Sequence, residues 1–392
     1  MAFISYRKKM RIIAIVSVVV AAILAVALWF LISDYNKKAK IRRDELHLLD
    51  IEMYEEIKNN DNYFDADVTP ADRELAEKMK NYNFYQKLEE RMQVNVLFLG
   101  NEITDGIGVS DYTYRWVNRF VSEIEDGYGS DLKGYNYGKV NSDAFYGYNI
   151  LNFAATSLTY DLVMICYGAN DDPATFKIYY DGLLRSIKNQ NSKCEIYCII
   201  EANPEGYSDN AEDVRELCAH YGGICIDMNE YFIANKIDMS ATLQGVLPNA
   251  EGNAAYYACI SKVVRENLLA DRQTKSEIKP NLSTTKSFDN YKVISREEMK
   301  QVSDTVFEFT ARGNIATLIY NKSYTDGGTI KVYVNGKKLQ TIDNKRENNT
   351  GGKEVDFYLI ATGLDGVNKI RIETGTADNT LNFYGVALSG VK

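Results

Sequence analysis

The chain has 392 residues, which is enough for two domains and additional segments. Its composition, 45% hydrophobic and 25% charged, is that of an ordinary globular protein. The formal net charge is -9, and no basic patch stands out beyond the N-terminal region. We therefore expect no nucleic-acid partner.

Residues 12–32, IIAIVSVVVAAILAVALWFLI, are apolar except for Ser17 and predict a transmembrane helix. The run is too long for a signal-peptide core, and no small-residue cleavage site follows it, so we expect an uncleaved anchor. Basic residues flank both of its sides, so the positive-inside rule does not decide the orientation. Because a very short tail, here residues 1–11, usually stays in the cytoplasm, we expect a single-pass protein of the cell membrane with its C-terminal domains outside.

Residues 33–93 are rich in Glu, Lys, Asn and Leu with helix-like spacing, and Pro70 and Asp72 mark a restart. This pattern predicts a helical stalk. A plain solvated spacer and a binding role remain equally open for it.

Residues 94–270 alternate between apolar strand-like runs and helical patterns, which predicts an α/β domain with a parallel sheet covered on both faces. The expected strands are 94–100, 162–168, 194–202 and 224–228, and the expected helices are 114–125, 176–190, 210–222 and 249–269.

A polar linker is expected at 271–286, followed by period-two alternation over 287–392. This second pattern predicts an all-β sandwich, with a hairpin turn at Asn335-Gly336. The six cysteines all lie in the α/β domain, and their spacing defines no disulfide framework. There is no paired CxxC, and His47 and His220 are the only histidines, so we expect neither a metal nor a cofactor.

Ligands of such sheets bind at the carboxyl ends of the strands. Three segments there carry the chemistry: GNEIT at 100–104, GAND at 168–171 and QGVLPNAEG at 244–252. On these segments the domain resembles the SGNH, or GDSL-type, hydrolases, a family with a flavodoxin-like three-layer fold. The resemblance implies a catalytic serine where Glu102 stands, an aspartate where Gln244 stands and a histidine where Leu247 stands. It also implies an oxyanion hole at residue 102, Asn170 and a glycine, for which Gly138 is the choice and Asn141 the alternative.

All three members of the implied catalytic triad are replaced. Glu102 is an anion and a poor acyl acceptor, Leu247 takes no proton, and Gln244 does not stabilise an imidazolium. We therefore expect a pseudoenzyme in which Glu102 accepts hydrogen bonds from Asn170 and nearby N–H groups and blocks the oxyanion hole. New acid–base chemistry of Glu102 with nearby aspartates, or a cation held by them, is the weaker interpretation. The candidate ligand-binding residues are Asn101, Asp105, Tyr112, Asp171 and Asn249.

The C-terminal sandwich is similar to the jelly-roll module that accompanies SGNH domains in carbohydrate esterases, which suggests a sugar context. The first hypothesis is a non-catalytic protein of the bacterial cell envelope that binds or scaffolds surface polysaccharide or its acylation machinery. The second is an active carbohydrate acyl-esterase or acyltransferase with a non-standard site. The third is a structural module that binds another envelope protein.

Overall fold

The computed structural model describes residues 81–156, 158–280, 282, 288, 290–346, 354–364 and 366–390. The predicted membrane span at 12–32 and most of the predicted stalk lie outside these residues. None of the helices within the described ranges is long and apolar enough to cross a membrane.

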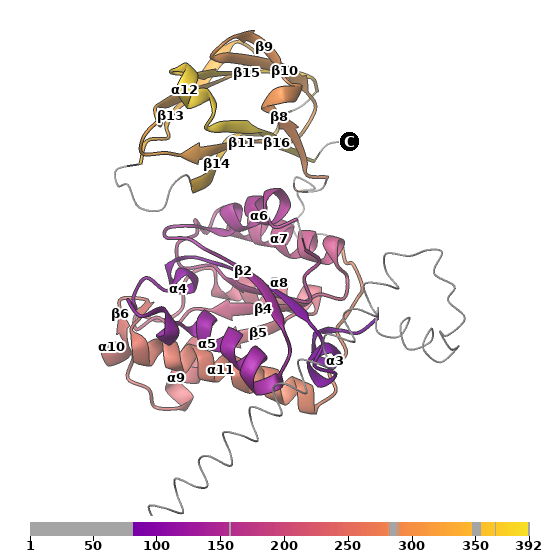
Figure 1. The fold of residues 1–392 in the computed structure, drawn as a ribbon, viewed down its shortest axis with the longest axis vertical. Coiled ribbons are helices and arrows are strands. Elements are labelled where there is room, and N and C mark those ends of the chain that lie inside the picture. The colour runs from indigo at the N-terminus through magenta and orange to yellow at the C-terminus, as the bar shows by residue number, and fades with distance from the viewer. Residues whose placement is uncertain are drawn as a thin grey trace, which may run out of the picture.

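The first domain is a three-layer α/β structure, the lower body in Figure 1. Its strands are β1 (Val94–Gly100), β2 (Leu132–Gly138), β3 (Leu162–Cys166), β4 (Glu195–Ile200) and β5 (Ile224–Asp227), with the small hairpin β6 (Leu243–Gln244) and β7 (Leu247–Pro248). Its helices are α3 (Phe84–Glu89), α4 (Glu102–Asp105), η1 (Tyr112–Tyr114), α5 (Trp116–Ser122), η2 (Glu123–Tyr128), α6 (Ala144–Phe153), α7 (Phe176–Gln190), α8 (Ala211–Tyr221), α9 (Met228–Ala234), α10 (Met239–Thr242) and α11 (Ala250–Leu269).

The central sheet has the order β2-β1-β3-β4-β5, and every pairing in it is parallel. This is the flavodoxin-like order, and the direction of winding reverses between β1 and β3. One apolar core joins the sheet to α6, α7 and α8, and a second joins its other face to α3, α5, α9 and α11. The expected parallel α/β fold is therefore correct, and its switch point places the site beyond Gly100 and Cys166.

Two elements differ from the sequence-based expectation. Helix α3 was assigned to the stalk, but its Phe84 and Leu88 are buried in the core with α11, so the domain begins before residue 94. Strand β2 was not predicted, because its sequence LKGYNYG has no continuous apolar run and most of its residues are exposed. Among the described strands it pairs only with β1, at the edge of the sheet.

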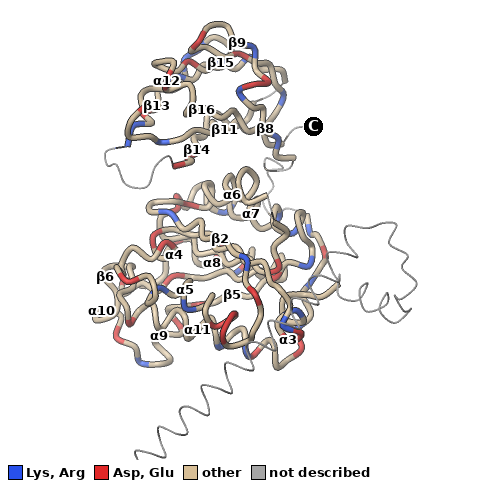
Figure 2. Tube along the Cα trace, in the orientation of Figure 1, with Lys and Arg blue, Asp and Glu red and all other residues tan. Residues whose placement is uncertain are grey.

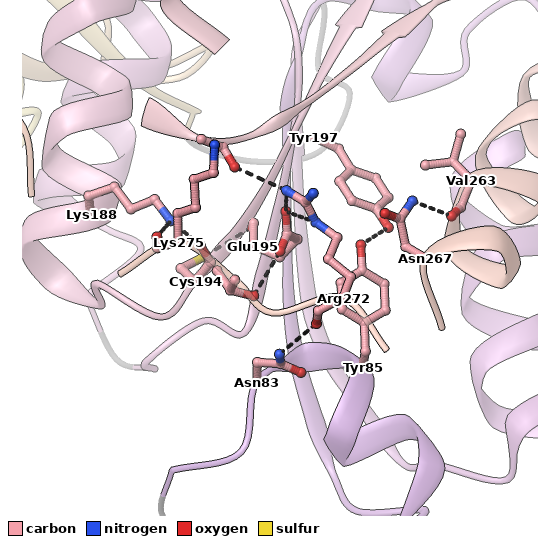
Figure 3. Close-up of polar contacts among 12 residues, drawn as sticks. Asn83, Tyr85, Lys188, Cys194, Glu195, Tyr197, Val263, Asn267, Arg272 and Lys275 are labelled. Carbon is pink, nitrogen blue, oxygen red and sulfur yellow. Dashed lines mark hydrogen bonds and ion pairs between the residues drawn. The ribbon is translucent and has the colours of Figure 1, made fainter. Parts of the chain in front are cut away.

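The segment after α11 is fastened across the amino-terminal edge of the sheet (Figure 3). Arg272 donates from Nε and Nη2 to Oε1 of Glu195, at 3.2 and 3.0 Å, and Glu195 is fully buried at the start of β4. The other carboxylate oxygen accepts from the Thr274 hydroxyl at 2.7 Å. Close by, Lys188 donates to the carbonyl oxygens of Cys194 and Lys275. These bonds fix the path of the chain toward the second domain.

The second domain consists of two antiparallel sheets. The sheets have the orders β13-β12-β15-β10-β9 and β14-β11-β16-β8. The elements are β8 (Lys292–Ser295), η4 (Arg296–Glu298), β9 (Lys300–Ser303), β10 (Val306–Ala311), β11 (Ile315–Lys322), β12 (Thr329–Val334), β13 (Lys337–Asp343), β14 (Glu354–Thr362), β15 (Asn368–Thr374), α12 (Ala377–Thr380) and β16 (Phe383–Ser389). The hairpin turn predicted at Asn335-Gly336 is confirmed between β12 and β13, with φ of 50° and 81° at the two residues.

The two domains share one apolar core. Helix α6 lies between the α/β sheet and the second domain, as Figure 1 shows, and its residues 144–151 are all buried. Phe357 of β14 packs against Tyr146 and Phe153 of α6, with ring centroids 5.5 and 6.1 Å apart. The hydroxyl of Tyr148 donates to the carbonyl oxygen of Phe288 at 2.9 Å. The sheet that contains β14 is thus a structural support of the α/β domain.

Candidate functional site

Strand β1 ends at Gly100, where the chain turns sharply into the short helix α4. Gly100 has no room for a side chain, because a Cβ there would lie 2.1 Å from Oγ1 of Thr104. The side chain of Asn101 caps the helix by accepting a hydrogen bond from the N–H of Ile103 at 3.0 Å. The turn places the half-buried side chain of Glu102 at the carboxyl edge of the sheet.

The carboxylate of Glu102 accepts hydrogen bonds from two other loops. Nδ2 of Asn170 donates to both of its oxygens, at 3.1 and 2.9 Å. The backbone N–H of Asn141 donates to Oε2 at 3.1 Å. An amide and a main-chain N–H aimed at one point are the kind of donors that stabilise an oxyanion in acyl transfer. Here the negative charge that they hold belongs to the protein itself.

The main-chain donor is Asn141 and not Gly138, the first choice of the sequence analysis. The N–H of Gly138 donates to Oδ1 of Asn136 at 2.8 Å. Gly138 serves packing, because a Cβ there would lie 2.3 Å from the backbone nitrogen of Asp105. Asn141 has a φ of 57°, a left-handed conformation that asparagine tolerates better than most residues. This conformation turns its N–H toward Glu102.

The loop that carries Asn141 is held by the second domain. Nζ of Lys139 lies 3.0 Å from Oε1 of Glu354 and 2.9 Å from Oδ1 of Asp356, both on β14. The same Nζ lies 4.6 Å from the ring centroid of Tyr146. The backbone N–H of Lys139 meanwhile bonds to the carbonyl of the residue that ends β1. The cation therefore ties the loop beside Glu102 to the neighbouring domain.

We expect the Lys139→Met variant to loosen this loop, because it removes the cation between the domains. Amide hydrogen exchange at Asn141 should become about ten-fold faster. The matched control is Lys322→Met, because Lys322 lies 2.6 Å from the other oxygen of Asp356 but belongs to the second domain. Exchange at Asn141 should be unchanged in the control. Equal exchange in both variants and the wild type would show that Lys139 does not hold the loop.

Asp171 is a buried support of the same loops. Its carboxylate accepts from the N–H of Ala144 at 2.7 Å and from the N–H of Gly168 at 3.0 Å. Burial raises its pKa to about 7, the charge of Asp143 adds to this, and the two backbone donors oppose it. Asp171 thus joins the start of α6 to the loop after β3.

Glu201, which the sequence analysis did not single out, is a second buried carboxyl group behind Glu102. Its Oε1 accepts from Nδ2 of Asn101 at 2.6 Å. Burial is the main cause that raises its pKa to about 7, and the negative charges of Asp171 and Glu102 contribute. In the sequence, this residue could have been recognised as a site candidate because it directly follows the apolar strand CEIYCII. Because it is buried, Glu201 supports the site from beneath and does not meet a ligand.

Two of the three replaced triad positions, Gln244 and Leu247, lie on the hairpin of β6 and β7. Gln244 pairs with Leu247 across it, and Gly245 forms the turn with a φ of 63°. Gln244 is exposed and Leu247 is half-buried. A Cβ at Gly108 would lie 2.6 Å from the carbonyl oxygen of Pro248, so the hairpin sits against the turn that follows α4. The hairpin thus lies near the segment of Glu102, but neither Gln244 nor Leu247 can act as a general base.

Three of the five candidate ligand-binding residues have structural roles instead. Asn101 and Asp171 are buried, so neither is open to a ligand. Asn249 caps α11, accepting from the N–H groups of Glu251 and Gly252. Asp105 is half-buried, and burial raises its pKa. Tyr112 is 65% exposed.

His220 does not reach the site. It lies in the last turn of α8, and that helix ends at the amino-terminal edge of the sheet, opposite to Glu102. Its Nε2 lies 2.9 Å from the carbonyl oxygen of Pro280. Within the described ranges, no group of three or more His, Cys, Asp or Glu residues is arranged to hold a metal ion. All six cysteines are free thiols.

A flavodoxin-like sheet with a glycine turn after β1, an asparagine amide after β3 and a main-chain donor after β2 matches the arrangement that the resemblance to the SGNH hydrolases implies. Residues 98–255 match the model of the GDSL-like Lipase/Acylhydrolase family. This match lies within the α/β domain, which is therefore similar to members of that family.

Solved structures show that the two-domain fold is shared. A two-domain esterase (CEX) active on acetylated mannans has a TM-score of 0.59 and 16% sequence identity, over 81% of this chain and 95% of that one. The structure of this esterase co-crystallised with mannopentaose has a TM-score of 0.60, with the same identity and coverage. At this identity the likeness shows the fold alone. A comparison with curated proteins found no match.

Proposed function

We propose that this protein is a non-hydrolytic member of the SGNH fold that binds acetylated polysaccharide of the bacterial cell envelope. In this proposal residues 12–32 anchor it in the cell membrane, and both described domains lie outside the cell. The observation that carries the proposal is the position of the Glu102 carboxylate on Asn170 and Asn141, the donors that a substrate oxyanion would need.

The chemistry of the site explains why hydrolysis should be lost. Acyl transfer by this type of site requires a hydroxyl nucleophile, a base that takes its proton, and free donors for the oxyanion. Glu102 replaces the hydroxyl and engages the donors. Leu247 stands where the base would be, and His220 lies at the opposite edge of the sheet. The carboxylate also repels the negative charge that builds up in the transition state.

Two observations support polysaccharide as the ligand. The fold over both domains is that of an esterase active on acetylated mannans. Lysine and arginine are scattered among aspartate and glutamate on both domains, as Figure 2 shows, and the net charge is -9. Such a surface favours a neutral ligand over a polyanion. Binding to an envelope protein, or to the acylation machinery, is the competing proposal.

The test is acetyl release by the full chain in detergent solution, from an activated aryl acetate and from acetylated mannan, with Glu102→Ala beside it. We expect no turnover above buffer in either protein. Binding of a panel of acetylated mannan, acetylated xylan and acetylated peptidoglycan is measured in parallel. We expect Glu102→Ala to fold and to keep the affinity of the wild type, because the carboxylate satisfies the donors and does not contact the ligand.

Each other outcome has a distinct meaning. Turnover that disappears in Glu102→Ala would make the protein an active esterase with a non-standard nucleophile or base. A folded Glu102→Ala protein that has lost glycan binding would make Glu102 a ligand contact. Wild-type protein that binds no glycan of the panel would leave the protein-binding hypothesis in its place.

A further inference from the structure

Strand β2 carries two tyrosines on the same face, of which Tyr135 is exposed and Tyr137 is half-buried. Tyr135 and Tyr137 are two residues apart, so both side chains leave the strand on the same side. Their rings are near-parallel, with an interplanar angle of 28° and centroids 6.1 Å apart. Tyr135 is 44% exposed. Most residues of β2 are exposed in the same way, although β2 belongs to the central sheet, where strands usually lie under helices.

The strand that carries this pair leads to the candidate site. Strand β2 ends at Gly138, which pairs with Gly100 at the end of β1. Lys139 follows directly and begins the loop that presents the Asn141 N–H to Glu102. The two tyrosines therefore lie on the edge strand that ends at the loop beside Glu102.

We propose that Tyr135 and Tyr137 form a binding surface for a neutral polysaccharide chain, which runs along the edge strand β2 toward Glu102. This inference rests on the proposed glycan-binding function and assigns it a location. Tyrosine rings offer apolar faces to the C–H groups of sugar rings, and their hydroxyls bond to sugar hydroxyls. The outer edge of β2 adds backbone N–H and C=O groups that pair with no other strand.

The first test is calorimetric titration of the full chain with acetylated mannan, acetylated xylan and acetylated peptidoglycan. We expect the Tyr135→Ala/Tyr137→Ala variant to bind the recognised glycan at least about ten-fold more weakly. Tyr324→Ala is the matched control, because Tyr324 is 45% exposed but lies on a loop of the second domain. It should bind as the wild type does. Wild-type affinity in the double variant would overturn the assignment of the surface.

Hydrogen exchange of the wild-type protein locates the ligand without any substitution. Saturation with the recognised glycan should protect the amides of residues 132–138. Protection elsewhere, with none along β2, would overturn the proposed location while leaving the glycan-binding function intact. A wild-type chain that binds no glycan of the panel would instead refute the proposed function, and this surface with it.

Discussion

The wild-type protein is expected to lose about 2 to 3 kcal/mol of stability between about pH 4.5 and about pH 7 that the Glu201→Gln variant does not lose. Burial, with the charges of Asp171 and Glu102, raises the pKa of Glu201 from 4.5 to about 7. A carboxyl group whose pKa is raised by folding stabilises the folded state fully below its unfolded pKa. That contribution is lost as the pH rises through the folded pKa, so it disappears between about pH 4.5 and about pH 7.

The measurement is the free energy of unfolding by denaturant at a series of pH values for the wild type and Glu201→Gln. The difference between the two proteins is informative, because titrating groups that do not interact with Glu201 cancel in it. Asp171→Asn should flatten the curve by a similar amount, since its pKa is also raised to about 7. Glu212→Gln is the control, because its side chain is 84% exposed. Parallel curves for the wild type and Glu201→Gln would contradict the expectation.

The Arg272→Met variant is expected to lose about 3 to 5 kcal/mol of stability. Among the described residues, the hydroxyl of Thr274 would then be the only side-chain partner of the fully buried Glu195 carboxylate. Figure 3 shows Arg272 against Glu195. A buried charge without its counter-ion is far more costly than the absence of both. The double variant Arg272→Met/Glu195→Met should therefore regain most of the lost stability.

Thermal and denaturant unfolding of the two single variants and the double variant gives the interaction energy directly. Lys177→Met is the control, because Lys177 forms exposed ion pairs with Asp213 and Glu216 and its removal should cost less than about 1 kcal/mol. If Arg272→Met costs no more than this control, the ion pair does not fasten the segment after α11.

The alternation of apolar strands and helices was sufficient to predict the parallel α/β domain, and the period-two pattern to predict the β domain. Strand β2 was not predicted, because Lys133, Gly134 and Asn136 interrupt any apolar run. A strand at the edge of a sheet is exposed, so burial does not select its residues. Helix α3 was assigned to the stalk for a different reason. Its apolar residues follow the pattern of any amphipathic helix, and only the structure shows that they pack in one core with α11.

The sequence by itself determined which residues of the expected triad are absent, because Glu102, Gln244 and Leu247 stand within recognisable motifs. Only the tertiary structure decided which groups surround Glu102. The main-chain donor came from Asn141, whose left-handed backbone directs its N–H, and side-chain identity does not reveal where an N–H points. Glu201 became part of the site because parallel strands distant in sequence end at one edge, so the electrostatics there depend on packing that no local pattern records.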